Sequence, residues 1–588
     1  MKPAPLSGTK PPGVSHRFVA PLDVHARLDD NEEWAFIDVR EQGAFDQGHP
    51  FWASNAPLSH LEWVMPELVP RKLTPVVLMD DADDGLARRA QQRLNDWGYT
   101  DVAIMQGGLQ GWREAQLPVH AGIHVPSKAF GEFVEHHHGT PSIDVQQLKE
   151  LIAQGQDLLL VDCRPFEEFN LSTLPGSINC PGMDLLTRVP GMLRSLDTLV
   201  VVHCAGRTRG IIGAQTLIHA QIAHSVVTLT NGMAGWILNG EALSHGNTQI
   251  AAKADPMLLG KTRSWVTQLG HSAGLNVINL EQLEQLKNEV QRSLFLFDVR
   301  TPEEFQTAHL PGFRLAPGGQ LIQSLDAFVG TRGSRIVLCD DDGVRARMTG
   351  YWLKQMGWSE IYVLEDPLMA SLWMSGTHTL RKPAELDKPA INVPTIQASV
   401  LQAQMAAGET VVIDLSDSLK FGRSHIPGAW FGVRARLNKA LTQIPPHRVV
   451  VLTSDNGDFA AVAWAEAQAL SKVPVVVLSG GNQAWAQAGF PMASGRDRMT
   501  TLNDDVWYSP LERPDPMAAI HEYLRWEIGL NDHLAIERGV RFQRPITKSR
   551  REVRHERLLP WIQTQRVFGG SERPGIDPIP LERARHLE

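Results

Sequence analysis

The chain has 588 residues, of which 43% are hydrophobic and 21% are charged, and these proportions are typical of globular proteins. The length predicts three to five domains, and the composition excludes a disordered chain, a collagen-like chain and a disulfide scaffold. The formal net charge of -9 argues against a general nucleic-acid-binding protein.

The ends and the cysteines of the chain indicate where the protein works. The first ten residues contain no apolar stretch, so no signal peptide is predicted. The sequence contains no run of about 18 apolar residues, so no transmembrane helix is predicted either. The cysteines form no CxxC pair and number only four, namely Cys163, Cys180, Cys204 and Cys339. So few thiols are typical of a reducing compartment. We therefore expect a cytoplasmic protein with no membrane partner and no nucleic-acid partner.

An apolar run that ends in aspartate occurs four times, at Asp38, Asp162, Asp298 and Asp414. Each copy continues with a second apolar run, a helix-like stretch, a third short strand and a turn that reaches a tryptophan. These tryptophans are Trp112, Trp236, Trp373 and Trp485, and the intervals from aspartate to tryptophan are 74, 74, 75 and 71 residues. Such agreement indicates four duplicated domains.

The repeats predict domains over residues 16–120, 140–246, 274–378 and 392–494. Short apolar runs alternate with helical stretches in each copy, which predicts a parallel sheet covered by helices on both faces. Ligands of such sheets bind at the carboxyl ends of the strands. The loop after the second apolar run is therefore the candidate site.

The segments outside the repeats are expected to be linkers and an extension. Linkers are predicted at 121–140, 246–275 and 376–392. The first contains His136, His137 and His138, for which a metal site is conceivable but a solvated linker is favoured. Residues 495–588 are expected to form an extension that is helical or partly disordered, with an amphipathic helix over 516–528.

The second copy carries Cys204 directly after its second apolar run. Backbone amides of the following loop and a helix that begins near Arg209 are expected to form an anion cradle. Arg207 and Arg209 add positive charge that can hold an oxyanion. All three features favour thiolate over thiol, so Cys204 is predicted to be a nucleophile aimed at anionic donors.

The other copies lack a cysteine at this position. Cys204 follows Asp162 by 42 residues. The same interval leads from Asp38 to Asp80 and from Asp298 to Asp340, and with a small shift from Asp414 to the region 453–456. Aspartate cannot form a persulfide and repels an anionic donor. We therefore expect copies one, three and four to be inactive.

Three further thiols need separate interpretations. Cys163 and Cys180 are expected to be packing thiols, although either could resolve an oxidised Cys204. Cys339 has an arginine six residues later, as in cysteine phosphatases, but three adjacent aspartates would repel phosphate and raise its pKa. Catalysis at Cys339 is therefore the less favoured interpretation.

The second copy resembles the rhodanese domain in five segments: 162–164, 166–169, 174–179, 204–209 and 231–236. The resemblance extends over about residues 16–495 as four tandem copies and implies three-layer α/β/α domains with five-stranded parallel sheets. It also implies transfer of sulfur from thiosulfate or mercaptopyruvate through a Cys204 persulfide, with no cofactor or metal. In this resemblance the substrate-binding loop consists of Ala205, Gly206, Arg207, Thr208 and Arg209. Thr173 stands where many members have histidine, so any role of that histidine is absent here.

The leading interpretation is a sulfurtransferase that moves sulfur from thiosulfate to cyanide, a thiol or a protein acceptor. A cysteine phosphatase is an alternative, but its loop needs an arginine six residues after the cysteine, and Gly210 stands there. A non-catalytic scaffold that binds persulfides is the third possibility.

Overall fold

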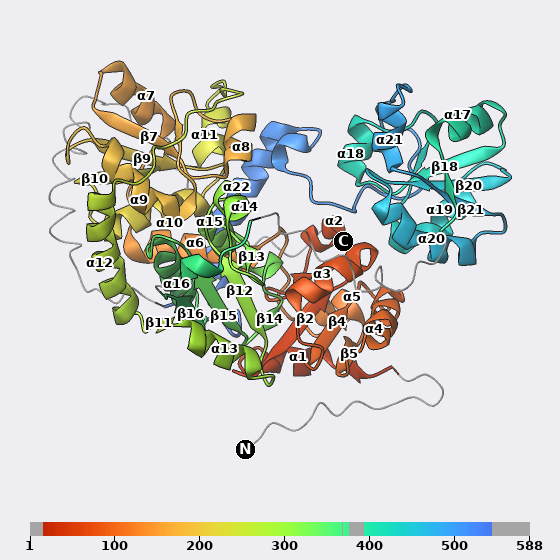
Figure 1. Cartoon of the computed structure of the whole chain (residues 1–588), viewed down its shortest axis with the longest axis horizontal. Coiled ribbons are helices and arrows are strands. Elements are labelled where there is room, and N and C mark those ends of the chain that lie inside the picture. Colours follow the sequence, from red (N-terminus) through yellow and green to blue (C-terminus); the bar gives the residue numbers. More distant parts are fainter. Residues whose placement is uncertain (1–15, 367–368, 376–392, 544–588) are drawn as a thin grey trace, which may run out of the picture. The chain divides into compact units, whose positions relative to one another are not determined.

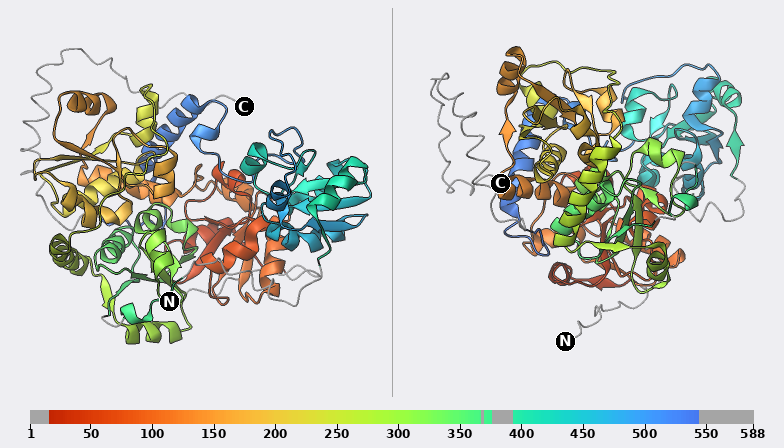
Figure 2. Two further views of the ribbon diagram at one scale, coloured as in Figure 1. Left: turned by 45° about the horizontal axis from the view of Figure 1, so that its top comes forward. Right: turned by 60° about the vertical axis from the view of Figure 1, so that its left-hand side comes forward.

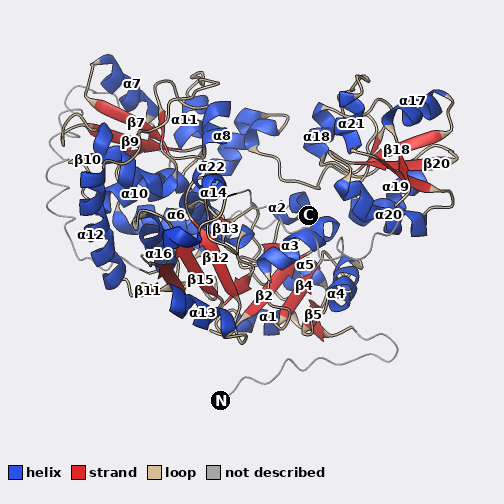
Figure 3. Cartoon of the chain, viewed as in Figure 1, coloured by secondary structure: helices blue, strands red, loops and turns tan. Residues whose placement is uncertain are grey.

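The structure is a computed structural model that describes residues 16–366, 369–375 and 393–543. Four α/β domains follow one another along these residues, each with a parallel β-sheet between helices (Figure 1 and Figure 3). The fold class expected from the sequence is confirmed. The predicted linker at 376–392 and the last part of the extension, 544–588, lie outside the described residues.

The first domain has the sheet order β1-β5-β4-β2-β3. Its strands are β1 (Phe18–Val19), β2 (Trp34–Asp38), β3 (Ser54–Asn55), β4 (Val76–Met79) and β5 (Val102–Met105). Its helices are α1 (Pro21–Arg27), α2 (Gln42–Asp46), α3 (Leu61–Leu68), α4 (Leu86–Asp96) and α5 (Gly108–Glu114). Strand β14 (Thr331–Arg332), which comes from the third repeat, adds a sixth strand antiparallel to β2. The first and third repeats thus share a sheet.

The second domain has the sheet order β6-β10-β9-β7-β8. Its strands are β6 (Ser142–Ile143), β7 (Leu158–Asp162), β8 (Ile178–Asn179), β9 (Leu199–His203) and β10 (Ser225–Leu229). Its helices are α7 (Val145–Ala153), α8 (Phe166–Leu171), α9 (Leu185–Arg188), α10 (Thr208–His219) and α11 (Gly232–Leu238). All five residues of β9 are buried, as befits a valine-rich strand with neighbours on both sides.

The third domain repeats the arrangement in the order β11-β16-β15-β12-β13. Its strands are β11 (Asn276–Ile278), β12 (Leu294–Asp298), β13 (Arg314–Leu315), β15 (Arg335–Cys339) and β16 (Ile361–Leu364). Its helices are α13 (Leu280–Asn288), α14 (Pro302–Thr307), α15 (Gly318–Gln323) and α16 (Arg345–Gln355).

The fourth domain has the order β17-β21-β20-β18-β19. Its strands are β17 (Thr395–Ile396), β18 (Thr410–Asp414), β19 (Trp430–Phe431), β20 (Val449–Thr453) and β21 (Val475–Leu478). Its helices are α17 (Ala398–Ala406), α18 (Ser418–Arg423), α19 (Leu437–Gln443), α20 (Asp458–Leu470) and α21 (Gly481–Gln487).

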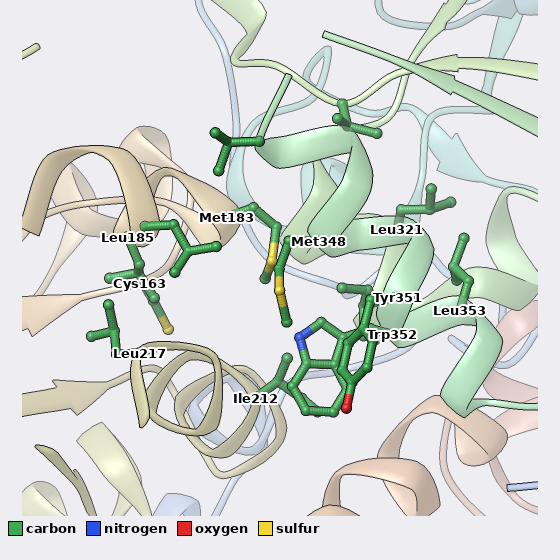
Figure 4. Packing of buried hydrophobic residues seen from close by; sticks show 14 of the residues in the cluster. Cys163, Met183, Leu185, Ile212, Leu217, Leu321, Met348, Tyr351, Trp352 and Leu353 are labelled. Carbon is green, nitrogen blue, oxygen red and sulfur yellow. The ribbon is translucent and has the colours of Figure 1, made fainter. Parts of the chain in front are cut away.

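One hydrophobic core is shared by the second and third domains (Figure 4). Met183 and Ile212 of the second domain face Met348 and Trp352 of the third in this core. The indole Nε1 of Trp352 donates to Thr216 Oγ1 at 2.9 Å. The two domains therefore bury their contact surface as a single domain buries its core.

The segment 121–140 is not the solvated linker that its composition suggested. It contains helix α6 (Val125–His138), whose buried residues include Phe130, Glu132 and Val134 and which packs against α10. The segment 246–275 likewise contains a helix, α12 (Pro256–Ser272). Polar side chains of 121–140 form contacts within the protein, as the Glu132 carboxylate does with Arg207.

The extension contains a helix, α22 (Pro516–His533), which is longer than the predicted stretch 516–528. It packs against α6 and α11, beside the second domain (Figure 2). Among the described residues, no helix has the length and apolarity needed to cross a membrane.

Candidate functional site

The same strand-end position recurs in all four domains. The strands β4, β9, β15 and β20 are followed directly by the residues Asp80, Cys204, Asp340 and Ser454. Each of these side chains accepts a hydrogen bond from an amide at the start of the next helix: Ala87 to Asp80 at 3.0 Å, Gly210 to Cys204 at 3.3 Å, Ala346 to Asp340 at 2.8 Å and Ala460 to Ser454 at 3.2 Å. The four positions are therefore structurally equivalent, and the fourth, which sequence counting left within 453–456, is Ser454.

The three copies without cysteine fill their own cradles with oxygen. Asp340 accepts a second amide hydrogen bond, from Gly343 at 2.9 Å, and Asp80 accepts one from Asp83 at 3.1 Å. A carboxylate in this position occupies the amides that an anionic ligand would need. In the first and third domains the protein's own carboxylate therefore occupies these amides.

Cys204 lies at the end of β9 with its Sγ directed at the first turn of α10. Only 2% of the residue is exposed. Its carbonyl oxygen accepts the Met233 amide at 2.9 Å, and that of Ala205 accepts the Ala234 amide at 2.9 Å. The start of the loop is therefore fixed to α11. Cys204 is buried because helices α6 and α22 pack over its loop.

The ionisation of Cys204 is favoured by its neighbours. The neighbouring thiol of Cys163, which donates to the His203 carbonyl oxygen at 3.2 Å, is the largest cause that lowers the pKa of Cys204. Arg209 and the Gly210 amide lower the pKa further, whereas burial and the carboxylate of Glu527 raise it. The resulting pKa is about 7, below the usual range of a cysteine. A substantial thiolate fraction is therefore expected near neutral pH.

Arg207 does not face the sulfur but points toward α6. Its guanidinium donates to both carboxylate oxygens of Glu132, at 2.7 and 2.8 Å, and also pairs with Glu135. It further donates to Asn231 Oδ1 at 3.0 Å. Burial raises the pKa of Glu132 to about 7, although Arg207 opposes that shift. In this conformation the charge of Arg207 is balanced by protein carboxylates, so its role in holding a donor stays a prediction.

Arg209 is likewise paired, but it acts on the cysteine through its charge. It donates to both carboxylate oxygens of Glu168, at 2.7 and 2.9 Å, and to Gln320 Oε1 at 3.0 Å. The third domain repeats this contact between Arg345 and Glu304 at 2.6 Å, beside a loop without cysteine in the equivalent position. The pair is therefore not specific to the domain with the cysteine, and the electrostatic effect of Arg209 on Cys204 is what the second domain adds.

Helix α22 lies against Gly206 and Thr208 of the loop, whereas Ala205 is exposed. The Thr208 hydroxyl donates to Glu527 Oε1 at 2.8 Å, and a Cβ on Gly206 would lie 3.3 Å from Glu527 Oε2. Glu527 is only 1% exposed, and its Oε2 has no hydrogen-bond partner among the described residues. The sequence predicted a helix here but gave no signal that its carboxylate would lie over the cysteine loop.

The repeated motif around Asp162 supports the sheet rather than touching the sulfur. Asp162 accepts hydrogen bonds from the backbone and guanidinium of Arg164 and from Thr173 Oγ1 at 2.7 Å. The first and third domains form the same aspartate–arginine pair without a cysteine loop. The neighbouring His203 lies beneath the loop, where its Nε2 is 2.8 Å from Ser177 Oγ.

Cys180, Cys339 and the histidine run lack the features of a site. Burial raises the pKa of Cys180 and of Cys339 well above the usual range, and Asp298 adds to the effect at Cys339. His138 lies in α6, and burial lowers its pKa to about 4. No group of three or more metal-ligating side chains is found within residues 16–366, 369–375 and 393–543.

We expect the alkylation rate of Cys204 by iodoacetamide to rise with pH, with a midpoint near 7, because only the thiolate reacts. Glu527→Gln removes a charge that raises the pKa, so the midpoint should move to lower pH. Glu522→Gln changes an exposed carboxylate of the same helix and should leave the midpoint unchanged. Peptide mass spectrometry gives the rates, and a wild-type midpoint near the free-cysteine value of about 8.5 would contradict the expectation.

Comparisons with known proteins identify relatives of the chain. The family model described as rhodanese-like domain matches residues 20–115, 144–239, 279–369 and 397–488, more than half of the chain. A thiosulfate sulfurtransferase from Pseudomonas aeruginosa, a solved structure, shares 38% identity with a TM-score of 0.85, covering 90% of this chain and 99% of that chain. No curated protein matches the sequence.

Two smaller solved structures also match. The Alr3790 protein from Anabaena sp. shares 23% identity, with a TM-score of 0.17, and the match covers 18% of this chain and 92% of that chain. A rhodanese-related protein from Thermoplasma volcanium shares 19% identity, with a TM-score of 0.16, and the match covers 17% of this chain and 97% of that chain.

Proposed function

The chain belongs to the rhodanese-like family, and from that premise we propose that it is a sulfurtransferase whose Cys204 carries sulfur as a persulfide. The donor is thiosulfate or a related sulfane-sulfur compound, and the acceptor is cyanide or a thiol. The observation that carries the proposal is the position of Cys204: of four equivalent strand ends it alone presents sulfur, and its pKa is about 7.

The reaction divides into two steps at one sulfur atom. The Cys204 thiolate attacks the outer sulfur of thiosulfate, a bond forms between the two sulfurs, and sulfite leaves with the electron pair of the broken S–S bond. The acceptor then attacks the outer persulfide sulfur, and Cys204 leaves as a thiolate. Cyanide would give thiocyanate, and a thiol would give a new persulfide. No net oxidant or reductant is required, as expected of covalent group transfer.

The loop supplies charge stabilisation for these steps. The Gly210 amide donates to the Cys204 sulfur at 3.3 Å, and Arg209 contributes positive charge beside it. Both interactions stabilise the thiolate that attacks in the first step and leaves in the second. The residues 205–209 are proposed as the donor-binding loop, and Arg207 and Arg209 would serve a dianionic donor if their carboxylate partners shift on binding.

Access to the sulfur is controlled by what covers it. Because Cys204 is only 2% exposed, a donor reaches it only when side chains of α22 or α6 move away from the loop. The carboxylate of Glu527 also opposes the approach of an anion electrostatically. The proposed function therefore includes a step in which these side chains move before the donor reaches Cys204.

Steady-state kinetics test the proposal. Varying thiosulfate at several fixed cyanide concentrations should give parallel double-reciprocal lines, because sulfite leaves before the acceptor reacts. Thiosulfate should be used with a higher kcat/KM than mercaptopyruvate, since the loop carries two arginines for a dianion. Intersecting lines, or turnover with neither donor, would contradict the proposal.

The burial of Cys204 favours one second candidate, a non-catalytic scaffold that stores a persulfide. Such a protein would take up sulfur from thiosulfate but would pass it to no small acceptor at a measurable rate. The cysteine phosphatase alternative has no such support, because Gly210, not arginine, follows Cys204 by six residues.

A further inference from the structure

Cys163 lies beside Cys204 because of the strand register. In the parallel pair β7–β9, Asp162 is opposite His203, so the next residues on the two strands are Cys163 and Cys204. The pairing continues past the strand ends, since the Cys163 amide donates to the His203 carbonyl oxygen at 3.0 Å. Neighbouring strands lie about 4.8 Å apart. That spacing falls within the range of about 4.4–6.8 Å between Cα atoms that a disulfide requires.

Both thiols face the same surface of α10. A Cβ on Gly210 would lie 3.7 Å from Cys204 Sγ, and a Cβ on Gly213 would lie 3.8 Å from Cys163 Cβ. Positions three apart on a helix are neighbours on its surface, with Cβ atoms about 5–6 Å apart. Cys163 and Cys204 belong to one hydrophobic cluster, and Figure 4 shows Cys163 directed toward α10 between Leu185 and Leu217.

The pair occurs only in the second domain. At the position of Cys163 the first, third and fourth domains have Val39, Val299 and Leu415, and at the position of Cys204 they have Asp80, Asp340 and Ser454. The fold therefore needs only an apolar side chain at the position of Cys163. A cysteine occupies that position in the one domain that also has a cysteine at the position of Cys204.

Cys163 is only 2% exposed but lies beside open space within the protein. It forms part of the wall of a cavity of about 620 Å³ between the second and third domains, which also reaches Arg188 and Arg300. A small product released beside Cys163 can leave through this cavity, and a reductant can approach the pair from the same side.

We propose that Cys163 is a resolving cysteine, which attacks the Cys204 persulfide and gives the chain a second activity, the release of sulfide. This inference rests on the proposed persulfide at Cys204. Cys163 loses its proton and forms a bond to Cys204 Sγ, and the bond between that Sγ and the outer sulfur breaks. The outer sulfur leaves with the electron pair as hydrosulfide. The sulfane sulfur is reduced to sulfide, the Cys163 thiol is oxidised to the disulfide, and a dithiol reductant restores both thiols.

The resolving step is expected to be slow near neutral pH. The hydrogen bond to Cys204 and burial raise the pKa of Cys163 well above the usual range, so little of it is thiolate. Before loading, its single thiol hydrogen has two acceptors within reach, the Cys204 sulfur and the His203 carbonyl oxygen at 3.2 Å. Sulfide release should therefore accelerate as the pH rises, and transfer to a fast external acceptor should outrun it.

The test uses the reduced full chain, treated with thiosulfate in the absence of cyanide and of any thiol. We expect the wild type to gain one sulfur on Cys204, then to release one sulfide per chain and to form a peptide cross-linked through Cys163 and Cys204. Cys163→Ser keeps a hydrogen-bond donor and Cys163→Val copies the first and third domains. Both should take up the sulfur at alkaline pH, keep it and lose sulfide release. Cys180→Ser, a buried thiol of the same domain, should behave as the wild type.

The outcomes separate this inference from the proposed function. A wild type that retains the sulfur indefinitely, releasing no sulfide as the pH is raised, overturns the resolving role and leaves the sulfurtransferase intact. Release that persists in both Cys163 variants overturns it as well. If neither the wild type nor either Cys163 variant takes up sulfur, the proposed function fails together with this inference.

Discussion

Cys204→Ser is expected to lower the rate of thiosulfate turnover at least about 10³-fold, because a hydroxyl in this loop cannot carry a transferable sulfur. The serine would resemble Ser454, which occupies the equivalent position of the fourth domain and accepts the Ala460 amide at 3.2 Å. The fold should therefore tolerate the change. The measurement is thiocyanate formation from thiosulfate and cyanide by the purified full chain.

Two other buried thiols provide matched controls for that substitution. Cys180→Ser and Cys339→Ser should retain activity close to that of the wild type, since the raised pKa values of both thiols make them poor nucleophiles. If Cys339→Ser abolished turnover while Cys204→Ser did not, sulfur transfer would have to be assigned to the third domain.

Arg345→Met is expected to destabilise the contact between the second and third domains by about 3–5 kcal/mol, the cost of leaving buried carboxylates without their partner. The guanidinium of Arg345 donates to Asp184 Oδ1 at 2.9 Å across that contact and to Glu304 Oε2 at 2.6 Å within its own domain. Burial raises the pKa of Asp184, and Arg345 is the largest influence that lowers it. Without Arg345, Asp184 would be left with only Arg188, 3.1 Å away.

Hydrogen exchange of peptides from α16 and from residues 182–184 measures this effect locally, which suits a chain of several domains. Asp184→Asn in the Arg345→Met background should recover part of the loss, because it removes a buried charge that has lost one of its two cationic partners. Arg448→Met removes an exposed pair with Glu409 and should change stability by less than about 1 kcal/mol. A loss below about 1 kcal/mol for Arg345→Met would show that the interface depends little on this charge cluster.

The sequence predicted the fold and the position of the reactive loop because both follow from short-range patterns. The repeated apolar runs predicted the strands. Because the spacing between the first and second apolar runs is equal in the first three copies, residue counting placed Cys204 at the same position as Asp80 and Asp340. The structure confirms four parallel-sheet α/β domains. A position at the end of a strand depends on neighbours in the chain, so counting residues was sufficient.

The surroundings of the loop could not be predicted in the same way. Glu132 binds Arg207 from a position 75 residues away in the sequence. Glu527 binds Thr208 from a position 319 residues away. No local pattern encodes which helix covers which loop. The run of three histidines in 136–138 also misled the prediction, because composition indicated a solvated linker whereas the apolar residues of α6 bury that helix. The proximity of Cys163 to Cys204 depends on the strand order, which only the structure supplies.

Mass spectrometry of the chain quenched soon after mixing with thiosulfate tests the role of Cys204 most directly. We predict that the peptide containing Cys204 gains the mass of one sulfur atom, that a reducing agent removes it, and that Cys204→Ser prevents the gain. An unmodified peptide in the wild type, or the same gain in Cys204→Ser, would contradict it.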